Sequence, residues 1–155
     1  KEVFGGMYEM TINSIIDGIS VALDAEFNAE SEEYTIRANE LKQGLKEPCF
    51  FISCINPTFR LFFDKRYFRE NPFCIQYFPK SRNKAKEECN DVADRLFLAL
   101  EYITVDGDLT MGTKMHSEFV DGVLNFFVNY DAFVYIRKDE PPIMEALTHD
   151  TTAKG

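Results

Sequence analysis

Two stretches of the chain carry apolar residues at the spacing of an amphipathic helix. From Thr11 onward, apolar positions recur at i, i+3, i+4 and i+7, which predicts a helix over residues 11–27 with Thr11 as its N-cap. Gly18 lies inside this helix and costs about 1 kcal/mol relative to Ala, unless close packing requires the missing side chain. Pro79 and Ser81 open the second helix, whose apolar face consists of Ala85, Cys89, Val92, Ala93, Leu96, Phe97, Leu100 and Ile103.

Shorter apolar runs in the first half of the chain predict strands. Residues 33–38 alternate as a short half-buried strand, and residues 49–55 form an apolar run that is too short for a stable helix. A buried central strand is therefore expected at 49–55. Residues 66–78 form the next predicted strand, in which Pro72 marks a bulge or an edge position.

The second half of the chain continues the strand pattern. Asp106-Gly107 is a turn signal, and strands are predicted near 109–113 and 115–121, followed by a long run over 122–136. The predicted order α-β-β-β-α-β-β-β describes an α+β fold, in which a mixed, mainly antiparallel sheet packs against two helices.

The segment PTFRLFFDKR, residues 57–66, follows no clear core period and predicts a long hairpin arm. Two interpretations stay open for its apolar side chains. They fold back on the core, or they project as an apolar patch rimmed by cations, which is typical of a protein contact. On the second interpretation, the candidate partner or subunit interface consists of Phe59, Arg60, Leu61, Phe62, Phe63, Lys65, Arg66 and Arg69.

A length of 155 residues favours one domain. We assign that domain to residues 10–138, set residues 1–9 apart as an upstream segment or one added during cloning, and expect residues 139–155 to be a flexible C-terminal tail. No apolar run approaches the length that spans a bilayer, so no membrane partner is expected. The first residues lack the pattern of a signal peptide, which predicts a cytosolic or assembly-borne protein.

Charge is unevenly distributed along the chain. The net charge is -9, but residues 60–86 hold eight basic and two acidic side chains. The acidic balance argues against a general nucleic-acid binder, although the basic stretch with its interleaved aromatics is compatible with single-stranded nucleic acid. Segregated patches of opposite sign also allow copies of one molecule to meet head to tail.

The sequence offers little support for catalysis, metal binding or cofactor binding. No Walker sequence, GxGxxG, GxSxG or HExxH occurs, and the histidines, His116 and His149, lie in a predicted strand and in the predicted tail. Asp106 and Asp108 fit a turn better than a calcium loop. The cysteines lack CxxC spacing and are interpreted as reduced core thiols. We therefore assign no catalytic, cofactor-binding or metal-ligating residue.

Acidic side chains on successive turns of the second helix form a further candidate for acid and base chemistry. They are interpreted as an ordinary solvated face, because nothing nearby in the sequence is expected to perturb their pKa values. The residues concerned are Glu87, Glu88, Asp91 and Asp94.

Four strings in combination resemble the phage tail terminator family found in prophages of Gram-positive bacteria. The resemblance covers about residues 10–137, and each string alone is an ordinary strand or helix. The strings are GLKEPCFFIS (44–53), KRYFRENPFCIQYFP (65–79), EECNDVADRLFLALEYI (87–103) and VDGVLNFFVNYDAFVY (120–135).

This resemblance implies a structural virion protein without catalysis. It implies a small α+β subunit that forms a homo-hexameric ring on the head-proximal end of the tail tube, stops tube polymerisation and joins the tail to the neck. The implied partners are other copies of the chain, the tail tube protein and a neck or head-tail connector protein, with the sheath protein as a further candidate. DNA would only pass through the ring lumen, and assembly would take place in the host cytoplasm.

Two alternatives stay open beside the tail terminator. A neck or head-completion adaptor of a phage or tail-like particle would bind the portal side instead of the tube end. A small-ligand-binding α+β domain or an enzyme is the third interpretation.

Overall fold

The computed structural model describes residues 2–4, 10–40 and 44–137. These residues form two helices, α1 (Ile12–Phe27) and α2 (Ala85–Ala99). The strands are β1 (Glu2–Phe4), β2 (Thr35–Ala38), β3 (Cys49–Cys54), β4 (Thr58–Phe63), β5 (Arg66–Glu70), β6 (Pro72–Phe78), β7 (Tyr102–Val105), β8 (Asp108–Met111), β9 (Thr113–Val120), β10 (Val123–Asn129) and β11 (Ala132–Arg137).

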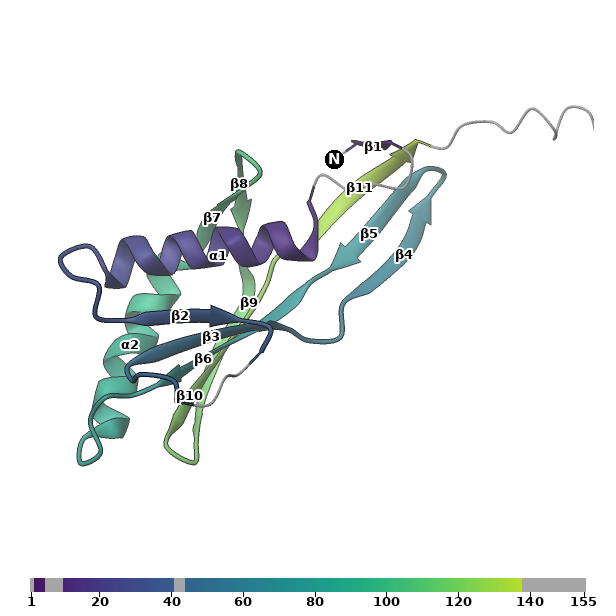
Figure 1. Cartoon of the computed structure of the whole chain (residues 1–155). Helices are drawn as coiled ribbons and strands as arrows, with labels where there is room; N and C mark the ends of the chain where they lie inside the picture. The colour runs from purple at the N-terminus through teal and green to yellow at the C-terminus, as the bar shows by residue number, and fades with distance from the viewer. Residues whose placement is uncertain (1, 5–9, 41–43, 138–155) are drawn as a thin grey trace, which may run out of the picture.

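The body of the molecule is a five-stranded sheet with both helices packed on one face (Figure 1). Its strand order is β2-β3-β6-β10-β9, and all neighbours are antiparallel except β2 and β3. Alternate side chains of the central strands point at the helices and build the core, in which Phe50, Ile75, Tyr77 and Phe126 are almost completely buried. The α+β class predicted from the sequence is confirmed.

Helix α1 begins where the sequence predicts. Thr11 is the N-cap, and its hydroxyl and that of Ser14 each accept a hydrogen bond from the other residue's backbone N–H. Gly18 faces β7 so closely that a Cβ atom would lie 2.6 Å from the carbonyl oxygen of Thr104. Close packing is thus the reason for a glycine inside this helix.

Helix α2 is shorter than its apolar pattern predicts. The helix ends at Ala99, and Ile103 belongs to β7, where it alternates with exposed neighbours. The helical period and the strand period both place Ile103 on a buried face, so the apolar pattern alone cannot separate them. Strand β7 then pairs with β8 across the Asp106-Gly107 turn, which the sequence predicts correctly.

A second sheet extends from the body as an arm, in the strand order β1-β11-β5-β4 (Figure 1). The predicted strands 66–78 and 122–136 are wrong as single strands, since each contributes one strand to the body and one to the arm. Both breaks lie together, because the backbone N–H of Asn71 donates to Asp131 and the Asn71 side chain donates to the carbonyl of Tyr130. These polar contacts lie where both segments of the chain, 66–78 and 122–136, pass from one sheet into the other.

Candidate functional site: the hairpin arm

The arm is an antiparallel hairpin of β4 and β5 that projects beyond the body (Figure 1). Every residue of β4 is exposed, and the exposed fractions of Leu61, Phe62 and Phe63 are 55%, 51% and 74%. Of the two interpretations left open by the sequence, the structure supports projection over folding back. Strand β4 is also the edge of its sheet, so its outer backbone groups face away from β5.

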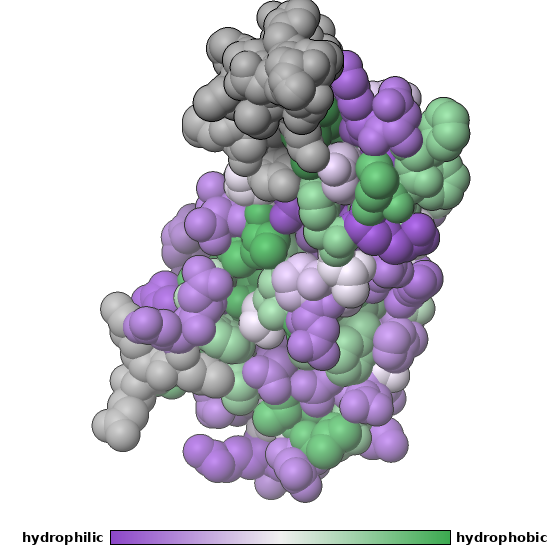
Figure 2. All heavy atoms as spheres, turned by 90° about the vertical axis from the view of Figure 1, so that its right-hand side faces the viewer, coloured by the Kyte–Doolittle hydropathy of each residue, from purple (hydrophilic) through white to green (hydrophobic). Residues whose placement is uncertain are grey.

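One face of the arm carries aromatic rings alternating with guanidinium groups. Register places Arg60, Phe68 and Phe133 side by side on three neighbouring strands. The ring of Phe133 lies 5.1 Å from that of Phe62 and 4.2 Å from the guanidinium carbon of Arg66. These cation–π and ring contacts hold the exposed side chains in defined positions. Figure 2 views the molecule from this end and shows apolar side chains interleaved with hydrophilic ones in its upper part.

The sequence did not assign Phe68 and Phe133 to this surface. Phe133 follows β4 by about 70 positions, and it comes close to β4 because both β11 and β4 pair with β5. The sequence does contain one indication of this surface. Residues 122–136 have apolar side chains on both faces, whereas a strand in a sheet that is buried on one side needs them on one face only.

Arg69 differs from the other predicted interface residues, because it is buried. Its exposed fraction is 8%, and its Nη1 donates to the backbone carbonyl of Met10 at 2.7 Å. Arg69 therefore ties the base of the arm to the segment that leads into α1. The interface role predicted for the other members stays a prediction; they are Phe59, Arg60, Leu61, Phe62, Phe63, Lys65 and Arg66.

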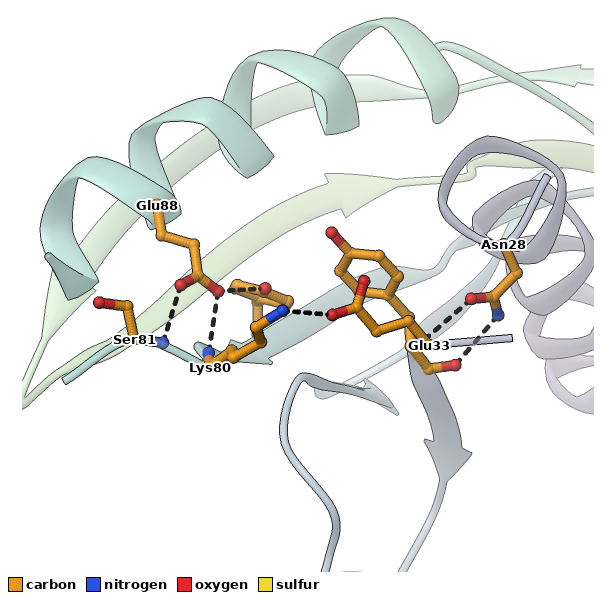
Figure 3. Close-up of polar contacts among 7 residues, drawn as sticks. Asn28, Glu33, Lys80, Ser81 and Glu88 are labelled. Atoms are coloured by element: carbon orange, nitrogen blue, oxygen red, sulfur yellow. Dashed lines mark hydrogen bonds and ion pairs between the residues drawn. The ribbon is translucent and has the colours of Figure 1, made fainter. Parts of the chain in front are cut away.

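The acidic cluster on α2 has a structural role at Glu88. Its carboxylate accepts hydrogen bonds from the hydroxyl of Tyr77 and from the backbone N–H groups of Lys80 and Ser81, at 2.9 Å for each N–H (Figure 3). Nearby, the Lys80 ammonium group forms an ion pair with Glu33 at 2.6 Å. Glu88 thus fastens the first turns of α2 to the end of β6.

The pKa of Glu88 is perturbed, contrary to the expectation from the sequence. Burial alone would raise its pKa, but the hydrogen bonds from Tyr77, Lys80 and Ser81 together outweigh burial and hold the pKa below its usual range. Burial and the same contact raise the pKa of Tyr77. Glu88 is therefore an ionised anchor at neutral pH and not a proton donor.

The cysteines have the character of core thiols. None forms a disulfide in the structure, Cys49, Cys74 and Cys89 are buried, and Cys54 is half-buried. Burial is the main factor that raises the pKa of Cys74 and of Cys89 to about 11. The interpretation as core thiols is thus supported for these two residues.

Within the described ranges, no group of three or more His, Cys, Asp and Glu side chains gathers in a way that would hold a metal ion. Neither of the two described helices is both long and apolar enough to cross a membrane.

A family model described as phage tail terminator protein matches residues 14–142. The chain belongs to the phage tail terminator family. It is therefore a structural component of a phage tail, as the resemblance of its four sequence strings implies. The match starts in the first turn of α1, includes the arm and the rest of the body, and continues past the end of β11 to residue 142.

Comparison with other proteins adds little to this assignment. No curated protein matches the sequence significantly. One solved structure, whose name gives neither a function nor an organism, is similar over 80% of this chain and 97% of its own, with 10% sequence identity and a TM-score of 0.39.

Proposed function

We propose that this chain is the tail terminator subunit that closes the head-proximal end of the phage tail tube. Six copies form a ring, and the ring stops tube polymerisation and joins the tail to the neck. The partners are other copies of the chain, the tube protein and a neck or connector protein, and DNA passes through the lumen. Assembly takes place in the host cytoplasm.

The exposed arm is the observation that carries this proposal. A subunit that ends a polymer needs one contact to its own copies and another to the polymer, and neither contact can be buried in the isolated chain. The arm offers apolar rings, fixed cations and a sheet edge on one projecting element. Such a surface is unusual for a monomer and typical of a protein contact.

Electron microscopy of tubes grown from the tube protein of the same phage tests the proposal. Addition of the chain should shorten the tubes and place a ring at one end only. The double variant Phe62→Ser with Phe63→Ser should leave the fold intact, because both side chains are exposed. The same variant should abolish the capping. Tubes that grow to the same length without a terminal ring would contradict the proposal, and a ring found only on portal complexes would favour the neck adaptor.

A further inference from the structure

A second apolar surface lies away from the arm, where the C-terminal half of α1 meets β7. A shallow groove of about 360 Å³ runs between them and is lined by Gly18, Val21, Ala22, Ala25, Tyr102 and Thr104. We call it the α1–β7 groove. Arg69 and Met10 place the base of the arm at the start of α1, so the groove lies further along the helix, away from the arm (Figure 1).

Exposed apolar side chains extend the groove onto the β7–β8 hairpin. Tyr102 pairs with Met111 and Thr104 pairs with Leu109, which places these side chains on one face of the hairpin. The exposed fractions are 69% for Val21, 73% for Leu109 and 51% for Met111. Because Tyr102 and Val21 line the same groove, this is one continuous surface and not a set of isolated residues.

The segments that form this surface are acidic, and we call their acidic side chains the rim of the groove. Residues 12–27 and 99–112 contain no Lys or Arg, and the acids among them are Asp17, Asp24, Glu26, Glu101, Asp106 and Asp108. Asp17 and Asp24 lie one helical turn before and after Val21. Of the six, Glu26 forms an ion pair with Arg95 of α2 at 2.9 Å. An apolar groove with this rim fits an apolar segment that carries cations.

The arm is such a segment. Its tip presents Phe62 and Phe63, and the neighbouring cations are Arg60, Lys65 and Arg66, against a single acid in the turn, Asp64. Since arm and groove lie on different parts of one chain, their contact joins unlike patches of two copies. Repetition of one such contact gives either a closed ring or an open filament.

We propose that the arm of one copy docks in the α1–β7 groove of the next copy. This inference rests on the proposed ring and specifies its subunit contact. The phenyl rings of Phe62 and Phe63 cover Val21, Tyr102 and the outer face of the hairpin. The arm cations lie against the acidic rim.

A charge exchange tests the contact in the full chain. Two double variants should each weaken association about tenfold or more, because like charges then face each other. They are Arg60→Glu with Lys65→Glu on the arm, and Asp17→Lys with Glu101→Lys on the rim. The two pairs combined should restore most of the affinity, which a loss of folding could not do. Glu87→Lys with Glu118→Lys is the matched control, since it makes the same charge change at exposed sites on α2 and β9, away from the groove.

Cross-linking gives an independent readout. Phe63→Cys on the arm and Leu109→Cys on the hairpin, in one chain, should give disulfide-linked oligomers on oxidation, whereas each single variant should not give a ladder beyond dimers.

Rings that form normally but show neither charge rescue nor this ladder would overturn the docking and leave the proposed ring standing. Loss of tube binding by the arm variant alone, with rim variants unaffected, would place the arm on the tube protein and also overturn it. Absence of any ring at tube ends would contradict both proposals.

Discussion

Some charged side chains of this protein stabilise its fold, whereas others are exposed and available for contact with a partner. Glu88 and Arg69 are both charged, yet each is held by specific polar partners inside the chain. Arg60 and Lys65, which precede Arg69 by nine and four positions, are exposed on the arm. Sequence analysis assigns these cations to one surface because they are close together in the chain and carry the same charge. The hydrogen bond from Arg69 to the backbone carbonyl of Met10 cannot be predicted from any residue pattern.

The anchor at Glu88 predicts a stability loss on acidification. Because its pKa is lowered in the folded state, its contribution is present above the pKa of an unfolded Glu and is lost as the pH falls through the folded value. Glu88→Gln should lower the free energy of unfolding at pH 7 by about 1 kcal/mol, a modest loss because the site is partly exposed. Urea unfolding from pH 3 to pH 7 measures it, and the difference between variant and wild type should shrink toward pH 3. A difference that is constant over this range would contradict the anchor.

At the scale of elements, the periodicity of apolar residues predicts those helices and strands that are determined by contacts within one segment. Both helices are predicted because their apolar stripes repeat within one segment. The strand breaks at Asn71 and Tyr130 are missed, because the alternation of apolar residues continues through them while long-range hydrogen bonds redirect the chain. For the same reason the sequence predicts that an arm exists but cannot decide whether its Phe side chains project.

The contact of α1 with β7 predicts an unusual response at Gly18. Ala is the better helix former by about 1 kcal/mol. Gly18→Ala should nevertheless lower the free energy of unfolding by about 1–2 kcal/mol, because the added Cβ meets the carbonyl of Thr104. Thermal unfolding measures it, with Val21→Ala at an exposed site of the same helix as a near-neutral control. If Gly18→Ala leaves the stability equal or raises it, the helix and β7 are less closely packed than the structure shows.

At the scale of the whole molecule, the net charge of -9 conceals two surfaces of opposite sign. The arm carries Arg60, Lys65 and Arg66, whereas the segments that form the α1–β7 groove, residues 12–27 and 99–112, carry six acids and no Lys or Arg. The sequence reveals the segregation of charge, and with it the possibility of a head-to-tail contact. It does not reveal the groove, since α1 and β7 are far apart in the chain and become neighbours only in the fold.

Sedimentation velocity of the purified chain, over a wide range of concentration at low and high salt, tests the central claim most directly. We expect the monomer to give way to a hexamer as concentration rises, and high salt to shift the transition to higher concentration, because it screens the arm and rim charges. The variant Arg60→Glu with Lys65→Glu should require still higher concentration. A monomer at every concentration and salt, indistinguishable from the variant, would contradict a ring closed by complementary charge.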